Sequence, residues 1–148
     1  MLPKQRAAAT ILLLTVLLFI FLARHDFSAH IAISRSKKMS VTHVVLFQFK
    51  PDLPVAEVRA ACSRFLALKE ACIHPTRQEA YVLSLRGGKD HSPEGLQNGM
   101  THGFVVEFAS VEDRDYYVNK DPAHLAFVKS IEALVDKATV VDFNDGAY

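Results

Sequence analysis

The chain has 148 residues, half of them hydrophobic, which is enough for one domain with a substantial core. Its formal net charge is only +1, but residues 1–38 carry six Lys and Arg against one acid, whereas residues 39–148 carry eleven against fifteen. An acidic folded part without a basic stripe argues against nucleic acid as a partner. Cys62 and Cys72 fall about 15 Å apart along one predicted helix, too far for a disulfide.

Residues 7–23 are an uncharged apolar run, with Lys4 and Arg6 before it and Arg24 after it. The run is near the lower length limit for a helix that crosses a bilayer. Three interpretations are open: a signal peptide, a signal-anchor helix, and an upstream extension that is absent if translation starts at Met39. The run is long for a signal peptide and lacks a small-residue cleavage site, which favours the anchor.

We therefore expect residues 1–40 to form a membrane anchor and a basic linker, and residues 41–148 to form the folded domain. Basic residues after the run slightly favour a cytosolic domain, and the absence of an Asn-x-Ser/Thr sequon agrees. The expected location is a single-pass membrane protein with a cytosolic domain, or the cytoplasm if translation starts at Met39.

The domain is expected to begin with a strand over residues 42–50, "THVVLFQFK". His43, Val45, Phe47 and Phe49 share one face, and the other face is also largely apolar, so both faces should be covered. An amphipathic helix is predicted to follow from Pro54, with Val55, Phe65 and Leu66 in its apolar stripe, and "HP" at 74–75 should end it.

Alternation predicts a second strand over residues 79–88 and a third over 100–110, joined by a glycine-rich loop. "SVED" is a capping-box pattern that starts a helix at Val111. The helix should break at "KDP" and restart at Pro122, with Asp121 as its cap. Residues 138–144 close the chain as a fourth strand.

The predicted order is β-α-β-β-α-β with a broken second helix, the split-βαβ arrangement of an α+β, ferredoxin-like fold. In this fold the helices cover only one face of the sheet. The second face is nevertheless apolar, and we expect it to press against a second copy of the chain in a homodimer. The residues that carry this expectation are Val44, Leu46, Val105, Val141 and Phe143.

Three histidines each head an apolar face of a different element: His43, His102 and His124. If these faces form one core, the imidazoles should converge at one end of it. A neutral imidazole can accept a proton at cellular pH, although a buried histidine often serves only to satisfy a backbone group. A zinc site is not expected, because no HxH or HExxH spacing is present, and the glycine-rich loop lacks the P-loop pattern. No cofactor is expected.

These segments resemble the stress-responsive dimeric α/β-barrel (Dabb) family over residues 41–145. The resemblance rests on "VTHVVLFQFK", "LRGGKDHSPEGLQNGMTHGFVVEF", "SVEDRDYYVNKDPAHLAF" and "VVDFNDG", in that order. It implies a ferredoxin-like subunit that pairs its sheet with a second copy. Most members have no assigned chemistry, but one plant member closes a polyketide ring by aldol condensation in a pocket between sheet and helices.

Carried over residue by residue, the resemblance implies a catalytic set of His43, His102, His124 and Tyr117. One extra residue separates the tyrosine from His124 here, so Tyr116 is the alternative. The expected function is acid–base catalysis on a small carbonyl compound in a hydrophobic pocket, with His124 as the acid–base group and without a cofactor. The alternative is a non-catalytic dimeric barrel that binds a hydrophobic ligand or only assembles.

Overall fold

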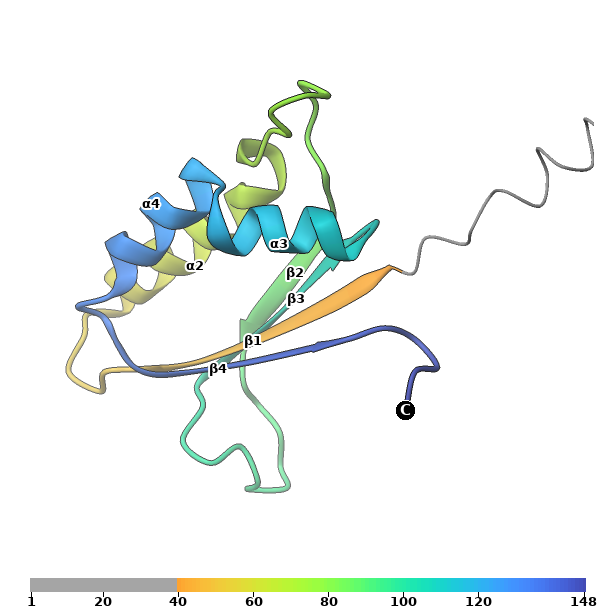
Figure 1. Cartoon of the computed structure of the whole chain (residues 1–148). Coiled ribbons are helices and arrows are strands. Elements are labelled where there is room, and N and C mark those ends of the chain that lie inside the picture. Colours follow the sequence, from red (N-terminus) through yellow and green to blue (C-terminus); the bar gives the residue numbers. More distant parts are fainter. Residues whose placement is uncertain (1–39) are drawn as a thin grey trace, which may run out of the picture. The chain divides into compact units, whose positions relative to one another are not determined.

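A computed structural model describes residues 40–148, and these residues confirm the predicted order, including the broken second helix (Figure 1). The elements are β1 (Val41–Phe49), α2 (Val55–Ala71), β2 (Val82–Lys89), β3 (His102–Phe108), α3 (Val111–Asn119), α4 (Pro122–Ile131) and β4 (Val135–Phe143).

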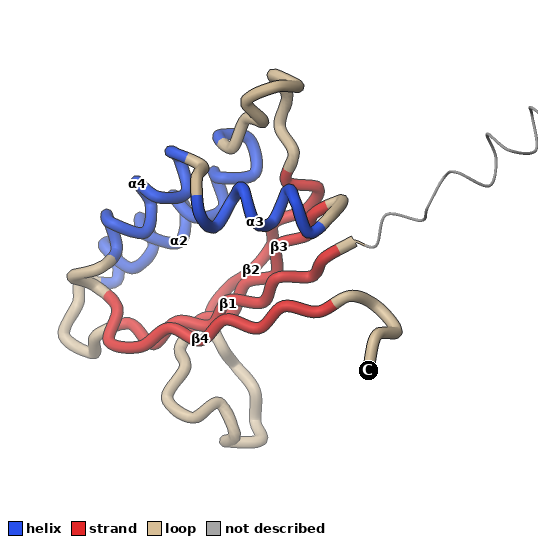
Figure 2. The backbone as a smooth tube through the Cα atoms, in the orientation of Figure 1, coloured by secondary structure: helices blue, strands red, loops and turns tan. Residues whose placement is uncertain are grey.

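The four strands form one antiparallel sheet in the order β2-β3-β1-β4, and α2, α3 and α4 all lie on the same side of it (Figure 2). This is the ferredoxin-like α+β fold. The inner strand β1 pairs with both β3 and β4, so residues 42–47 have a neighbour on either side. His43 lies opposite Val106 on β3 and Asp142 on β4, and Phe47 lies opposite His102.

The core forms between the helices and the helix-facing side of the sheet. Alternate residues of β1, from Val41 to Phe49, are buried on this side. Phe65 from α2 stacks on Phe127 from α4 at 4.7 Å between ring centroids and contacts Phe104 from β3 at 4.6 Å. Aromatic side chains from three elements therefore hold the helices to the sheet.

Two predicted helix caps are confirmed. The Ser110 side chain accepts a hydrogen bond from the backbone N–H of Asp113 at the start of α3. The Asp121 carboxylate accepts the N–H groups of Ala123 and His124 at the start of α4, where Pro122 is the first helical residue. Each cap satisfies N–H groups that have no partner inside their own helix.

The opposite face of the sheet is uncovered by any helix among residues 40–148. Val141 and Phe143 of β4 lie on it and are 54% and 45% exposed. Val44 of β1 lies beside Val141 in the ladder, and Val105 of β3 lies on its other side. The centre of this face is apolar, as the sequence predicts, whereas the Arg86–Glu107 ion pair and Lys137 lie nearer its margins.

Several boundaries and one helix face differ from the sequence expectations. Strand β2 begins at Val82 rather than at 79, because Ala80 forms only an isolated bridge with Ile73. Strand β4 begins at Val135 rather than at 138; as an edge strand it tolerates charged residues that obscure the pattern. In α2 the buried residues are Ala61, Phe65 and Leu68, whereas Val55 and Leu66 are exposed.

The predicted anchor over residues 7–23 lies outside the described residues. Among residues 40–148, none of the helices has the length and apolar character needed to cross a membrane.

Candidate functional site

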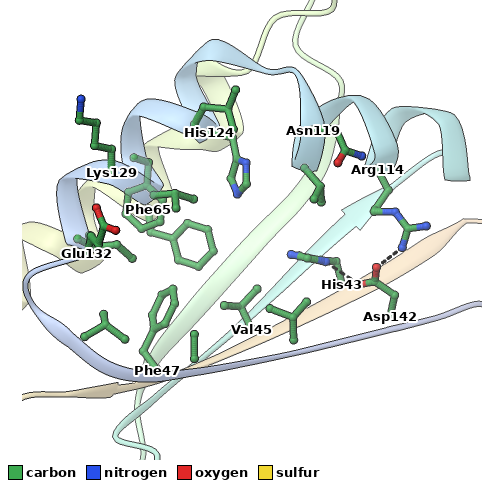
Figure 3. A pocket seen from close by; sticks show the side chains of 18 of the residues that line it. His43, Val45, Phe47, Phe65, Arg114, Asn119, His124, Lys129, Glu132 and Asp142 are labelled. Atoms are coloured by element: carbon green, nitrogen blue, oxygen red, sulfur yellow. Dashed lines mark hydrogen bonds and ion pairs between the residues drawn. The ribbon is translucent and has the colours of Figure 1, made fainter.

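A cavity of about 860 Å³ lies between the sheet and the α3–α4 pair (Figure 3). Its apolar wall comes from β1, α2, α4 and β4 and includes Phe47, Phe65, Phe127, Ile131 and Val140. Leu125, Val128 and Val140 are about half exposed, so this side is open to solvent. Both His43 and His124 line the cavity, from β1 and α4 respectively.

The imidazole of His43 is held by a carboxylate from the neighbouring strand. Its Nδ1 lies 2.5 Å from Oδ1 of Asp142, its direct partner across the β1–β4 ladder. A carboxylate can only accept, so Nδ1 carries a proton, and in the neutral ring Nε2 is then the acceptor. The edges of Phe108 and Tyr117 also contact the ring, which is only 5% exposed. The ring is therefore fixed in both orientation and tautomer.

Asp142 has a second partner from α3. Its Oδ2 accepts a hydrogen bond from Nη1 of Arg114, whose Nε donates to Oδ1 of Asp115 at 2.9 Å. Figure 3 shows the contacts of Asp142 with Arg114, which lies above the carboxylate, and with His43, which lies beside it. A line of charged groups thus leads from the surface of α3 to the imidazole at the cavity wall.

His124 lies in the first turn of α4, and its ring projects from the helix toward the cavity (Figure 3). Burial, followed by the nearby His43, lowers its pKa to about 4, although Asp121 acts in the opposite direction. His124 is therefore neutral at cellular pH. Its Nδ1 is buried and has no hydrogen-bond partner among the described residues.

Tyr117 lies behind the two histidines. Its ring is 4.0 Å from that of His124 and 6.0 Å from that of His43, between centroids, and it is fully buried. Its hydroxyl has no partner among the described residues, and burial raises its pKa, so it remains a neutral donor. The alternative, Tyr116, instead contacts His74 and Tyr81. Of the two tyrosines, the structure places Tyr117 beside the histidines.

The expectation that three imidazoles converge is wrong for His102. Antiparallel pairing puts it opposite Phe47, about 13 Å along the strand from the position opposite His43. There its ring meets Phe49 edge-on, and its Nδ1 lies 3.0 Å from the Thr101 hydroxyl. Burial, and then Lys89, lower its pKa. His102 faces the core, but from the other end of the sheet.

Asp142 and Arg114 were not predicted as site residues from the sequence. The one available signal was an acid in the apolar strand "VVDF", because a carboxylate in such a strand usually has a partner. Which partner it has depends on the register between β1 and β4, which cannot be read from the strands themselves. Among residues 40–148, no group of three or more His, Cys, Asp or Glu side chains is arranged to hold a metal.

Residues 41–145 match the family model of the stress responsive A/B barrel domain (Dabb), and the chain belongs to this family. The chain is 30% identical to the stress-response A/B barrel domain-containing protein At5g22580 of Arabidopsis thaliana, over 68% of this chain and 82% of that protein. It is 27% identical to olivetolic acid cyclase of Cannabis sativa, over 71% of this chain and 96% of the cyclase.

Among solved structures, the fold is similar to that of the hydroxynitrile lyase from Passiflora edulis. The TM-score is 0.62 at 20% identity, over 74% of this chain and 97% of the lyase. Other structures with this fold are dimeric ferredoxin-like proteins. The matched domain makes up nearly all of the cyclase and of the lyase, so residues 39–148 are expected to fold without the preceding segment.

Proposed function

We propose that this protein is a cofactor-independent acid–base catalyst acting on a small carbonyl compound with an apolar tail. The observation that carries the proposal is the pair of histidines on the wall of one apolar cavity, one held by a carboxylate and the other kept neutral by burial. Two imidazoles in different electrostatic surroundings can take different roles in one reaction, one as the base and the other as a hydrogen-bond donor.

In this proposal His43 is the base. With Nδ1–H donated to Asp142, the lone pair on Nε2 takes a proton from the carbon next to the carbonyl. The C–H electron pair moves into the carbon–carbon bond, and the carbonyl oxygen becomes an enolate oxygen. Asp142 stabilises the imidazolium that forms. The proton then returns to the substrate or to the product.

His124 is the group that faces the carbonyl oxygen. A histidine with a pKa of about 4 is a weak base, but its neutral N–H can donate a hydrogen bond to a developing enolate. This reverses the roles expected from the sequence, where His124 was the acid–base group. Tyr117 is not part of the cavity wall; it lies fully buried behind both rings and supports them.

The relatives support a small-molecule reaction of this kind. One of them is a cyclase and one protein of the same fold is a lyase, as their names state. The cavity wall is mainly aliphatic and aromatic, and its charged residues lie on α3, on β4, and on α4 or directly after it. Such a wall favours a substrate with a hydrocarbon part over a sugar or a nucleotide.

A second candidate function is storage or transport of a hydrophobic ligand. The half-exposed apolar residues at the open side of the cavity favour it, because they would bind such a ligand without chemistry. This candidate does not require the contact between His43 and Asp142.

Exchange of hydrogen for deuterium separates the two candidates. Incubation of 2-nonanone in D₂O with residues 39–148 should place deuterium on the carbons next to the carbonyl, as measured by mass spectrometry. His43→Asn should slow this exchange by about 10²–10⁴-fold, whereas His102→Asn, at the other end of the sheet, should keep the rate. The alternative result is that the unaltered domain binds the ketone and exchanges its hydrogens no faster than the His43→Asn variant does. That result would establish the ligand-binding function. If the exchange rate falls with decreasing pH around a midpoint near pH 4, the base is His124 and not His43.

We also infer that two copies pair through the uncovered sheet face, and that the full-length chain is attached to a membrane. The apolar residues Val44, Val141 and Phe143 support the pairing, as do the dimeric neighbours of the same fold. The apolar run at residues 7–23 supports the attachment, with the domain on the cytosolic side. If translation starts at Met39, the domain is instead cytoplasmic.

A further inference from the structure

We propose that Arg114 is a positioning residue for His43: it fixes the carboxylate of Asp142 and thereby the tautomer and direction of the imidazole. The inference rests on the proposed function in one respect only, namely that His43 is the base. The hold itself is a property of the folded chain and can be measured without turnover.

Asp142 needs a second partner to be an effective support. It lies on β4, the edge strand of the subunit's sheet, and its side chain is 26% exposed. A carboxylate with one hydrogen bond at such a place can rotate toward water. Here its two oxygens have separate partners, His43 on Oδ1 and Arg114 on Oδ2. A carboxylate held at both oxygens presents Oδ1 to His43 in one orientation.

Arg114 is itself held in place. It lies on α3, whose start is capped by Ser110, and α3 packs against β1. Its Nε donates to Asp115 while its Nη1 donates to Asp142, so the planar guanidinium is fixed along two directions. Partial burial alone would lower the pKa of Arg114, but these two carboxylates raise it, and the group stays charged. A lysine at this position could not bond both acids with one rigid plane.

Arg114 affects the cavity through Asp142, which holds His43. While Oδ1 stays in place, the proton of His43 stays on Nδ1 and the lone pair of Nε2 stays available. If Asp142 swings away, the neutral ring is free to place its proton on either nitrogen. A ring with the proton on Nε2 cannot accept a proton from the substrate at that atom. Loss of Arg114 should therefore lower kcat and leave KM nearly unchanged, because Arg114 borders the cavity but the apolar residues that would bind the substrate are unchanged.

The test is a long-range ¹⁵N–¹H correlation NMR spectrum of the histidine rings in residues 39–148 at pH 8. In the unaltered domain, His43 should show one protonated and one bare nitrogen, and its signals are assigned by their absence in His43→Asn. In Arg114→Met the two nitrogen shifts should move toward each other, as expected for mixed tautomers. Arg64→Met is the matched control, because Arg64 lies on α2 and bonds only the exposed Ser130 hydroxyl among the described contacts. It should leave the His43 signals unchanged.

Deuterium exchange into 2-nonanone gives the second readout, with about a tenfold loss of kcat or more expected for Arg114→Met. Arg114→Lys, which keeps the charge, should recover part of the one-tautomer spectrum. The Arg114–Asp142 pair is partly exposed, so its loss should cost little stability, and Arg114→Gln serves as a second neutral variant. Unchanged His43 nitrogen shifts in Arg114→Met and Arg114→Gln would overturn the inference. Absence of exchange by the unaltered domain would overturn only the proposed function, because the tautomer measurement does not depend on it.

Discussion

Replacement of Asp121 by alanine should destabilise the domain strongly, because this carboxylate joins three separate groups in the core. Oδ1 accepts the backbone N–H groups of Ala123 and His124, at 2.8 and 3.1 Å, at the start of α4. Oδ2 accepts the hydroxyl of Tyr81, at 2.7 Å, from the segment just before β2. Asp121 is completely buried, so water cannot replace it in the native state.

The size of the effect follows from these contacts. Loss of a helix cap costs about 0.5–2 kcal/mol. The Tyr81 hydroxyl, buried with its ring, would lose the Asp121 carboxylate as its partner, and an unsatisfied buried donor costs about 1–3 kcal/mol. The two effects together predict a loss of about 3 kcal/mol in the free energy of unfolding of Asp121→Ala.

Urea denaturation of residues 39–148, followed by circular dichroism, measures this loss. Asp115→Ala is the matched control: it also removes a hydrogen-bonded aspartate, but the Asp115 side chain is 56% exposed, and its loss should cost about 1 kcal/mol or less. Tyr81→Phe should cost less in the Asp121→Ala background than in the unaltered domain, because its partner is already gone. A loss below about 1 kcal/mol for Asp121→Ala, or full additivity with Tyr81→Phe, would show that the buried contacts do not hold α4 as argued.

Four further predictions follow from the structure and the sequence. His124 has a pKa of about 4 in the folded state and about 6.5 in the unfolded state, so the unfolded state binds more protons as the pH falls from about 6.5 to 4. The free energy of unfolding should therefore drop by on the order of 3 kcal/mol over this window. The same drop in urea titrations of His124→Asn would contradict this. Gly87→Ala should lower the free energy of unfolding by about 1–3 kcal/mol, because a Cβ there would clash with the Phe104 ring and the backbone carbonyl of Gly103. Gly88→Ala is the control, because a Cβ at Gly88 meets open space. Equal denaturation midpoints for the two variants would show that Gly87 is not required for this close approach. Light scattering of residues 39–148 at micromolar concentration should give twice the monomer mass, and a folded monomer would disprove the pairing of the sheets. The full-length chain should remain with membranes in sodium carbonate and be released by detergent; release by carbonate alone would rule out an anchor.

Local interactions made the helix starts predictable from the sequence. Asp121 caps N–H groups two and three residues further on, and Ser110 caps one three residues further on. Such contacts need only the chain around them, so they can be read from neighbouring residues. The alternation in β1 is similarly local, and it correctly assigned His43 and Phe47 to the buried side. Element order, and with it the ferredoxin-like fold, followed from these local patterns.

The candidate site could be predicted only in part, because its contacts are not local. His43 and Asp142 are 99 residues apart in the sequence and meet because β4 pairs with β1 in one register. The same kind of antiparallel register sends His102 to the far end of β3, although its position on the buried face was predicted correctly. Strand alternation specifies the face that a side chain occupies but carries no information on how far along the neighbouring strand its partner lies.

Sequence patterns predicted the elements, their order, the buried face of β1 and three histidines, two of which line the cavity. The fold was needed to show that Asp142 and Arg114 belong to the site and that His102 does not line the cavity. It also showed that Tyr117 rather than Tyr116 contacts the histidines, and that α2 buries Ala61 instead of Val55. Elements form from contacts within a few residues, whereas the pairing of strands and the rotation of a helix against the sheet minimise the free energy of the whole domain. The chemistry of the cavity depends on the second kind of contact.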